Sequence, residues 1–171
     1  MKAENYIKLE FPARAVNEGF ARQPLYLLYH FNLGYPLISE SCELLIDATR
    51  TYPQDEYSAG FEKVWAETTA PVPGYRQNNF YHDLPADEDG FRHYGVRNAD
   101  IDTTMKVSFR SPIMDKIFQW RNFASGDYIM GLEPTSMLMV GRRAEEAGEL
   151  KFTEPGQAIT NDFRFDFTPA G

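Results

Sequence analysis

The sequence predicts an all-β protein, and a layered sandwich rather than a closed barrel. Three observations support this fold class. Several segments alternate apolar and polar residues, which is typical of half-buried strands. The 11 prolines and 12 glycines are spread along all 171 residues, and this spacing suits short strands joined by turns. No segment has the apolar spacing that predicts a long amphipathic helix.

The N-terminal part of the chain is predicted to contain strands separated by irregular segments. Tyr6–Phe11 alternates, so its apolar residues share one face. Leu25–Phe31 is nearly all apolar or aromatic, as a strand covered on both faces would be, and Cys42–Ile46 is a shorter strand. Tyr52–Tyr57 is polar and interrupted by proline, and Thr69–Tyr75 contains two prolines and a glycine, so both are predicted to be loops.

The remainder of the chain repeats this pattern. Asp87–Gly90 is predicted to form a hairpin turn, and Ile113–Asn122 is predicted to contain a helical turn. In the last strand, three phenylalanines alternate with charged residues. The predicted strands are Asn79–Leu84, Phe91–Val96, Asp102–Arg110, Tyr128–Leu132, Glu149–Thr153 and Ile159–Phe167.

Composition limits the classes of function. The chain has 17 Lys and Arg against 25 Asp and Glu, a net charge of −8, which argues against nucleic acid or an anionic membrane as the main partner. Its single cysteine, Cys42, excludes an internal disulfide framework and a cysteine-rich zinc site. No apolar run approaches the ~18 residues that span a bilayer. Met1–Glu10 lacks the apolar region of a secretory signal, so we expect a cytoplasmic protein.

Two side chains are candidates for proton transfer. His30 lies in an aromatic segment followed by Asn32 and a Gly-Tyr-Pro turn, and it could point into a cleft as a proton donor or be a hydrogen-bonded core histidine. Glu133 follows an apolar strand that Pro134 is expected to end. It is either an exposed residue at the strand end or a base whose pKa is raised by a partly desolvated pocket.

A third group of residues suits sugar recognition. Gln77–Asp83 alternates amides, an imidazole and a carboxylate with aromatic rings. Sugars need paired hydrogen bonds for their hydroxyls and an aromatic ring for their apolar face. Gln77 and His82 are therefore candidate sugar contacts, and Trp120 is either a second platform or a core residue. His82 and Asp83 would point to opposite faces of a strand, so no metal site is expected.

These motifs together resemble the aldose 1-epimerase (galactose mutarotase-like) superfamily. Tyr-His-Phe-Asn-Leu-Gly-Tyr-Pro at 29–36 is similar to its histidine-containing strand. Phe-Tyr-His-Asp-Leu at 80–84 and Gly-Asp-Tyr-Ile-Met-Gly-Leu-Glu-Pro at 126–134 resemble segments of an uncharacterised branch, described as a domain of unknown function. Gly141-Arg142 and Glu154-Pro155-Gly156 resemble the end of that branch.

The resemblance implies a β-supersandwich that interconverts sugar anomers without a cofactor. Carried over to this sequence, Glu133 would be the base and His30 the acid. Asn32, Gln77, His82 and Trp120 would contact the substrate. Where the branch has an acidic residue before its Phe/Tyr-His strand, this chain has Gln77-Asn78-Asn79, so a carboxylate that orients the substrate would be absent unless Asp83 replaces it.

The length of the chain is a second departure from the superfamily, whose members are roughly twice as long. The chain resembles their C-terminal half, so residues 1–171 are expected to form one half-sandwich domain. Exposed strand edges favour association, either of two copies as a dimer or with a separate N-terminal half. The sequence is compatible with two origins, a split gene product and a fragment. It is also compatible with three functions: a sugar isomerase, a non-catalytic carbohydrate-binding module and an interaction half-domain.

Overall fold

Two antiparallel sheets of five strands each form the body of the molecule in the computed structural model, which describes residues 6–139 and 150–171. The first sheet has the order β1 (Ile7–Val16), β12 (Ala158–Thr168), β8 (Thr103–Arg110), β7 (Arg92–Asn98), β4 (Glu43–Leu45). The second has the order β3 (Asn32–Gly34), β10 (Asp127–Thr135), β9 (Lys116–Ala124), β6 (Asn78–Asp83), β5 (Arg50–Pro53). The predicted layered sandwich is confirmed.

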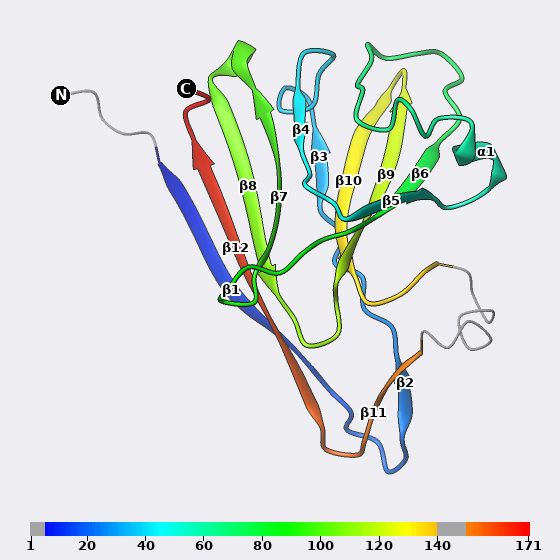
Figure 1. Cartoon of the computed structure of the whole chain (residues 1–171), viewed down its shortest axis with the longest axis vertical. Helices are drawn as coiled ribbons and strands as arrows, with labels where there is room; N and C mark the ends of the chain where they lie inside the picture. Colours follow the sequence, from blue (N-terminus) through cyan, green and yellow to red (C-terminus); the bar gives the residue numbers. More distant parts are fainter. Residues whose placement is uncertain (1–5, 140–149) are drawn as a thin grey trace.

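The smaller elements lie outside these two sheets. β2 (Gln23–Leu25) and β11 (Lys151–Thr153) form a two-stranded sheet at the lower end of Figure 1. The helical residues described are one short helix, α1 (Glu56–Ala59), and one 3₁₀ turn, Ala99–Ile101. No helix in the described ranges has both the length and the apolar character to cross a membrane.

The core lies between the two sheets. Alternate side chains of β7, β8 and β12 meet alternate side chains of β9 and β10, as the period of two of a strand requires. Burying each large apolar side chain contributes about 1.5–3 kcal/mol before conformational entropy is counted. The fully buried core residues include Tyr94, Val107, Phe109 and Phe163 of the first sheet and Ile117, Phe123, Met130 and Leu132 of the second.

Several local predictions were wrong, and Tyr52–Tyr57 is the first. Tyr52–Tyr57 is not a loop, because β5 extends through Pro53 and α1 begins at Glu56. Pro53 is tolerated because β5 is the edge strand of its sheet. Asp55 starts the helix by accepting a hydrogen bond from the Ser58 amide at 2.7 Å.

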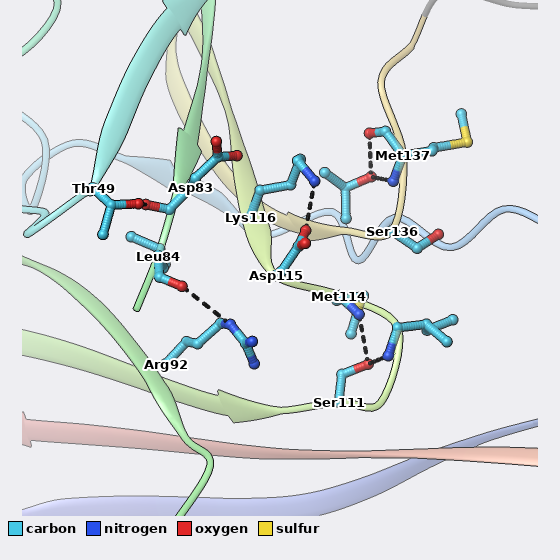
Figure 2. Close-up of polar contacts among 12 residues, drawn as sticks. Thr49, Asp83, Leu84, Arg92, Ser111, Met114, Asp115, Lys116, Ser136 and Met137 are labelled. Carbon is cyan, nitrogen blue, oxygen red and sulfur yellow. Dashed lines mark hydrogen bonds and ion pairs between the residues drawn. The ribbon is translucent and has the colours of Figure 1, made fainter. Parts of the chain in front are cut away.

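Ile113–Asn122 contains no helical turn, because β9 begins at Lys116. Figure 2 shows the turn that precedes this strand: Ser111 Oγ accepts hydrogen bonds from the amides of Ile113 and Met114 at 3.1 and 3.0 Å. A serine side chain that satisfies two nearby amides replaces the first turn of a helix with a tight loop. β8 and β9 therefore follow one another in sequence but lie in different sheets.

Leu25–Phe31 is not one strand. β2 ends at Leu25, and Leu28 forms an isolated bridge to Thr135 before β3 begins at Asn32. Gly141-Arg142 and Glu149, which the sequence analysis singled out, lie outside the described residues.

Candidate functional site

His30 and Glu133 meet on one face of the second sheet. β3 pairs with β10 so that Asn32 lies opposite Gly131, and the same register extended toward the N-terminus places His30 opposite Glu133. The Nε2 atom of His30 lies 3.0 Å from Oε1 of Glu133. The two residues that the sequence analysis proposed as acid and base, 103 positions apart in the numbering, are therefore brought into contact.

The backbone around this pair explains the close approach. Hydrogen bonds run from the Leu132 amide to the Phe31 carbonyl at 3.2 Å and from the Tyr29 amide to the Pro134 carbonyl at 2.9 Å. The residues between these bonds form a non-hydrogen-bonded pair, in which facing side chains are closest. The strand also continues past Pro134, contrary to our prediction. Proline is tolerated there because the amide that it lacks would face the irregular segment before β3 and no other strand.

Glu133 is a desolvated carboxylate. Its side chain is 1% exposed, whereas that of His30 is 50% exposed. Burial raises the pKa of Glu133 from 4.5 to about 7. Oε1 is at ion-pair distance from His30 but lacks the alignment of a hydrogen bond, so it has no hydrogen-bond partner among the described residues. A carboxylate with so little stabilisation of its charge accepts a proton readily near neutral pH.

The surface around this pair, which we call the site face, follows from the strand register. Trp120 on β9 lies directly opposite Gly131, and its ring meets that of His30 edge to face at a centroid distance of 5.7 Å. The site face consists of Asn32 on β3, Ile129, Gly131 and Glu133 on β10, Phe118 and Trp120 on β9, and Asn79, Tyr81 and Asp83 on β6.

One end of the site face is covered and the other is open. Phe118 and Tyr81 are 3% and 2% exposed and lie side by side, with ring centroids 5.1 Å apart. The Tyr81 hydroxyl accepts a hydrogen bond from the Met139 amide at 2.7 Å. Asn32 and His30 are exposed and Trp120 is half-buried, so a ligand could reach Glu133 from their side.

His82 lies on the opposite face of the sheet. It is fully buried, and its pKa is lowered from 6.5 to about 4 by desolvation. The Gln119 amide nitrogen donates to the Trp65 carbonyl at 3.1 Å, so the Gln119 oxygen is left to accept from His82 Nε2, also at 3.1 Å. Thr51 Oγ1 lies 2.9 Å from Nδ1 and donates to it. His82 is therefore a neutral histidine of the core with both ring nitrogens hydrogen-bonded, and it is not a sugar contact.

Two further residues from the sequence analysis lie at the margins. Gln77 is exposed and precedes β6. Asp83 does lie on the site face, but beyond Tyr81, and its carboxylate accepts a hydrogen bond from the Tyr52 hydroxyl at 3.3 Å. Neither residue is in the immediate surroundings of the His30–Glu133 pair.

Gly131 and Phe118 lie on the site face but were not among the predicted site residues. Gly131 precedes Glu133 by two positions in one strand, and this spacing places both on the same face. Phe118 could not be found in this way, because its strand was not predicted. In the described part of the chain, no group of three or more His, Cys, Asp or Glu side chains is arranged to hold a metal ion.

The largest hollows on the described residues lie away from the pair. Five surface hollows of about 230 to 580 Å³ lie elsewhere on the described residues, and neither His30 nor Glu133 lines any of them. The open end of the site face, around His30, Asn32 and Trp120, holds a small ligand weakly unless something covers it.

Known proteins share the sequence pattern and the fold of this chain. The family described as "Domain of unknown function (DUF4432)" matches residues 4–167. The chain belongs to this family. No curated protein matches it.

Three solved structures share the fold. A "putative aldose 1-epimerase" from Klebsiella pneumoniae subsp. pneumoniae MGH 78578 has a TM-score of 0.87 at 19% identity, over 95% of this chain and 44% of that one. The Slr1438 protein from Synechocystis sp. PCC 6803 scores 0.66 at 20% identity, over 95% and 51%. A "putative aldose 1-epimerase" from Escherichia coli K12 scores 0.60 at 14% identity, over 98% and 62%.

These similarities confirm the predicted galactose mutarotase-like sandwich fold, and the family match confirms the predicted resemblance to a domain of unknown function. At 14 to 20% identity they concern the fold alone. The chain spans 44 to 62% of the length of the three proteins.

Proposed function

We propose that this DUF4432 chain carries the acid–base pair of a sugar isomerase that interconverts anomers in the manner of an aldose 1-epimerase. The observation that carries the proposal is the 3.0 Å contact between the exposed His30 and the buried Glu133. The names of two structural relatives agree with it. An aromatic ring, Trp120, stands beside the pair, where the apolar face of a sugar could stack.

The proposed reaction needs two proton transfers, one at each of the two oxygen atoms bonded to the anomeric carbon C1. Glu133 accepts the proton of the anomeric hydroxyl, while protonated His30 donates its Nε2 proton to the ring oxygen. The bond from C1 to the ring oxygen breaks and the open-chain aldehyde forms. After rotation about the C1–C2 bond, ring closure reverses both transfers and restores both side chains. Because both sugar oxygens are bonded to C1, the acid and base must lie close together, as they do here.

Each residue has the property that its role requires. The Glu133 pKa of about 7 makes its carboxylate a stronger base than an exposed glutamate, yet leaves it largely ionised slightly above neutral pH. His30 reaches solvent, so it can meet a substrate that arrives over Asn32 and Trp120. We propose Asn32 and Trp120 as substrate contacts, and the exposed Gln77, just before β6, as a third one. His82 is excluded because it is buried on the opposite face of the sheet.

The test is anomer interconversion across a panel of aldoses, followed by NMR. We expect a catalysed rate for the full chain that falls at least about 100-fold in Glu133→Gln and His30→Gln. His93→Gln is a matched control, because His93 also contacts a carboxylate, Asp87, at 2.8 Å but lies on the first sheet. If the wild-type rate equals the uncatalysed rate for every sugar, the isomerase proposal is rejected for this chain.

A second candidate is a carbohydrate-binding module without turnover. It is favoured by the exposed Asn32 and the half-buried Trp120, which place a polar group and an aromatic ring at the open end of the site face. This function predicts sugar binding in calorimetry that survives Glu133→Gln together with an absence of catalysed exchange. No heat with any aldose would exclude it.

We further propose that another polypeptide associates with this chain, either a second copy or a separate chain that supplies what the longer relatives have. The outer strand β1 supports this proposal. Ile7, Leu9 and Phe11 point from β1 toward the side of the core, yet they are 61%, 53% and 40% exposed. β1 is also an edge strand with one side unpaired in the described sheet. Such an apolar edge favours association.

A further inference from the structure

Gly131 lies at the centre of the site face. Asn32 on β3 and Trp120 on β9 are its direct cross-strand neighbours. Its φ is not among the positive values that favour glycine in this chain. The backbone of β10 would therefore accept another residue here, and the reason for a glycine must be sought in the space above it.

That space is occupied by the Glu133 side chain. A Cβ at position 131 would lie 2.2 Å from Oε1 of Glu133, 3.0 Å from its Cδ and 3.3 Å from its Cγ. Glu133 therefore folds back over Gly131, two residues before it on the same strand. A Cβ that overlaps three atoms of one side chain would force that side chain to move.

We propose that Gly131 is a positioning residue whose missing side chain leaves the space in which the Glu133 carboxylate rests beside His30. Its importance for turnover depends on the isomerase proposal, but its effect on the carboxylate does not. The open side of the site face lies toward the exposed His30 and Asn32. A carboxylate displaced from Gly131 toward the exposed His30 would gain water and lose the desolvation that raises its pKa.

The chain provides a matched control in Gly34. This glycine lies on the adjacent strand β3 and pairs with Ile129, so it shares the site face. A Cβ at Gly34 would meet only the Tyr128 carbonyl oxygen, at 3.8 Å, an ordinary contact. Gly34→Ala thus repeats the change in chain entropy and volume without touching Glu133.

The experiment is ¹³C NMR titration of the Glu133 carboxyl, assigned with Glu133→Gln, in wild type, Gly131→Ala and Gly34→Ala. We expect the Glu133 pKa to fall from about 7 toward 4.5 in Gly131→Ala and to stay near its wild-type value in Gly34→Ala. An unchanged value in Gly131→Ala, or an equal fall in both variants, would overturn the proposal.

Two additional measurements separate folding and function from positioning. If Gly131→Ala does not fold, it is combined with Glu133→Ala: recovery of the fold supports the proposal, and failure in that background refutes it. In the anomer-exchange assay we expect kcat to fall about tenfold or more with KM little changed. A shifted carboxyl pKa without any wild-type turnover would keep the positioning role and reject the isomerase.

Discussion

Burial of an ionisable carboxylate in the site face should cost the protein stability, and Glu133→Gln should recover it. The substitution keeps the shape of the side chain and removes its charge. The pKa of Glu133 is 4.5 for an ordinary glutamate and about 7 in the folded protein. At about 1.36 kcal/mol for each pH unit, this difference corresponds to about 3 kcal/mol.

The sign follows from proton binding. Between pH 4.5 and about 7 the folded protein holds the Glu133 proton more tightly than the unfolded chain does. The contribution of Glu133 to stability therefore declines as the pH rises through this window and stays low above it. Glutamine does not titrate. The difference in free energy of unfolding between Glu133→Gln and wild type should therefore shift in favour of the variant by up to about 3 kcal/mol as the pH rises across this range.

Urea unfolding followed by tryptophan fluorescence, at several values between about pH 5 and about pH 8, measures this gain. Glu88→Gln is the control, because Glu88 lies in the exposed turn before β7. That variant should stay within about 0.5 kcal/mol of wild type throughout. A gap between Glu133→Gln and wild type that is constant or shrinks as the pH rises would refute the assignment of Glu133 as a desolvated carboxylate.

Three other predictions concern the surroundings of the pair. His82, buried with a pKa of about 4, should remain neutral at about pH 5 in an NMR titration, and its contribution to stability should be lost as the pH falls from 6.5 toward 4; a midpoint near 6.5 would contradict its burial. Trp120→Ala should weaken sugar binding about tenfold in calorimetry, with the fold kept in circular dichroism; unchanged affinity would remove Trp120 from the site. Ile7→Ser combined with Leu9→Ser should reduce association in light scattering, and an identical mass distribution would show that β1 is not the interface.

Local patterns were sufficient for most strands but not for β2, β3, β5 and β9, and β9 shows one physical reason. Gln119 and Arg121 are polar and buried inside that strand, so its sequence shows neither the alternation of a half-buried strand nor a continuous apolar run. Their side chains donate hydrogen bonds to distant segments, Gln119 to the Trp65 carbonyl and Arg121 to Asn78 at 2.6 Å. Such partners become visible only once the fold is known, because a buried polar residue requires them and sequence spacing does not reveal them.

The sequence could propose the two residues of the candidate pair but not their geometry. His30 and Glu133 could be proposed from their sequence contexts, but their contact depends on the register between the β3 segment and β10. His82 was proposed as a sugar contact because it lies among aromatic residues. The alternation along β6 tells which residues share a face with His82. Only the pairing of β6 with β9 shows that this face points to the interior.

The central claim is that Glu133 and His30 together exchange protons with a sugar, and the pH dependence of anomer exchange tests it most directly. The catalysed rate of the full chain should rise as Glu133 ionises, with a midpoint at about pH 7 set by its raised pKa. Glu133→Gln should abolish that limb, whereas His93→Gln should leave it in place. A catalysed rate that keeps the same pH profile in Glu133→Gln, or no catalysis by wild type at any pH, would contradict the account.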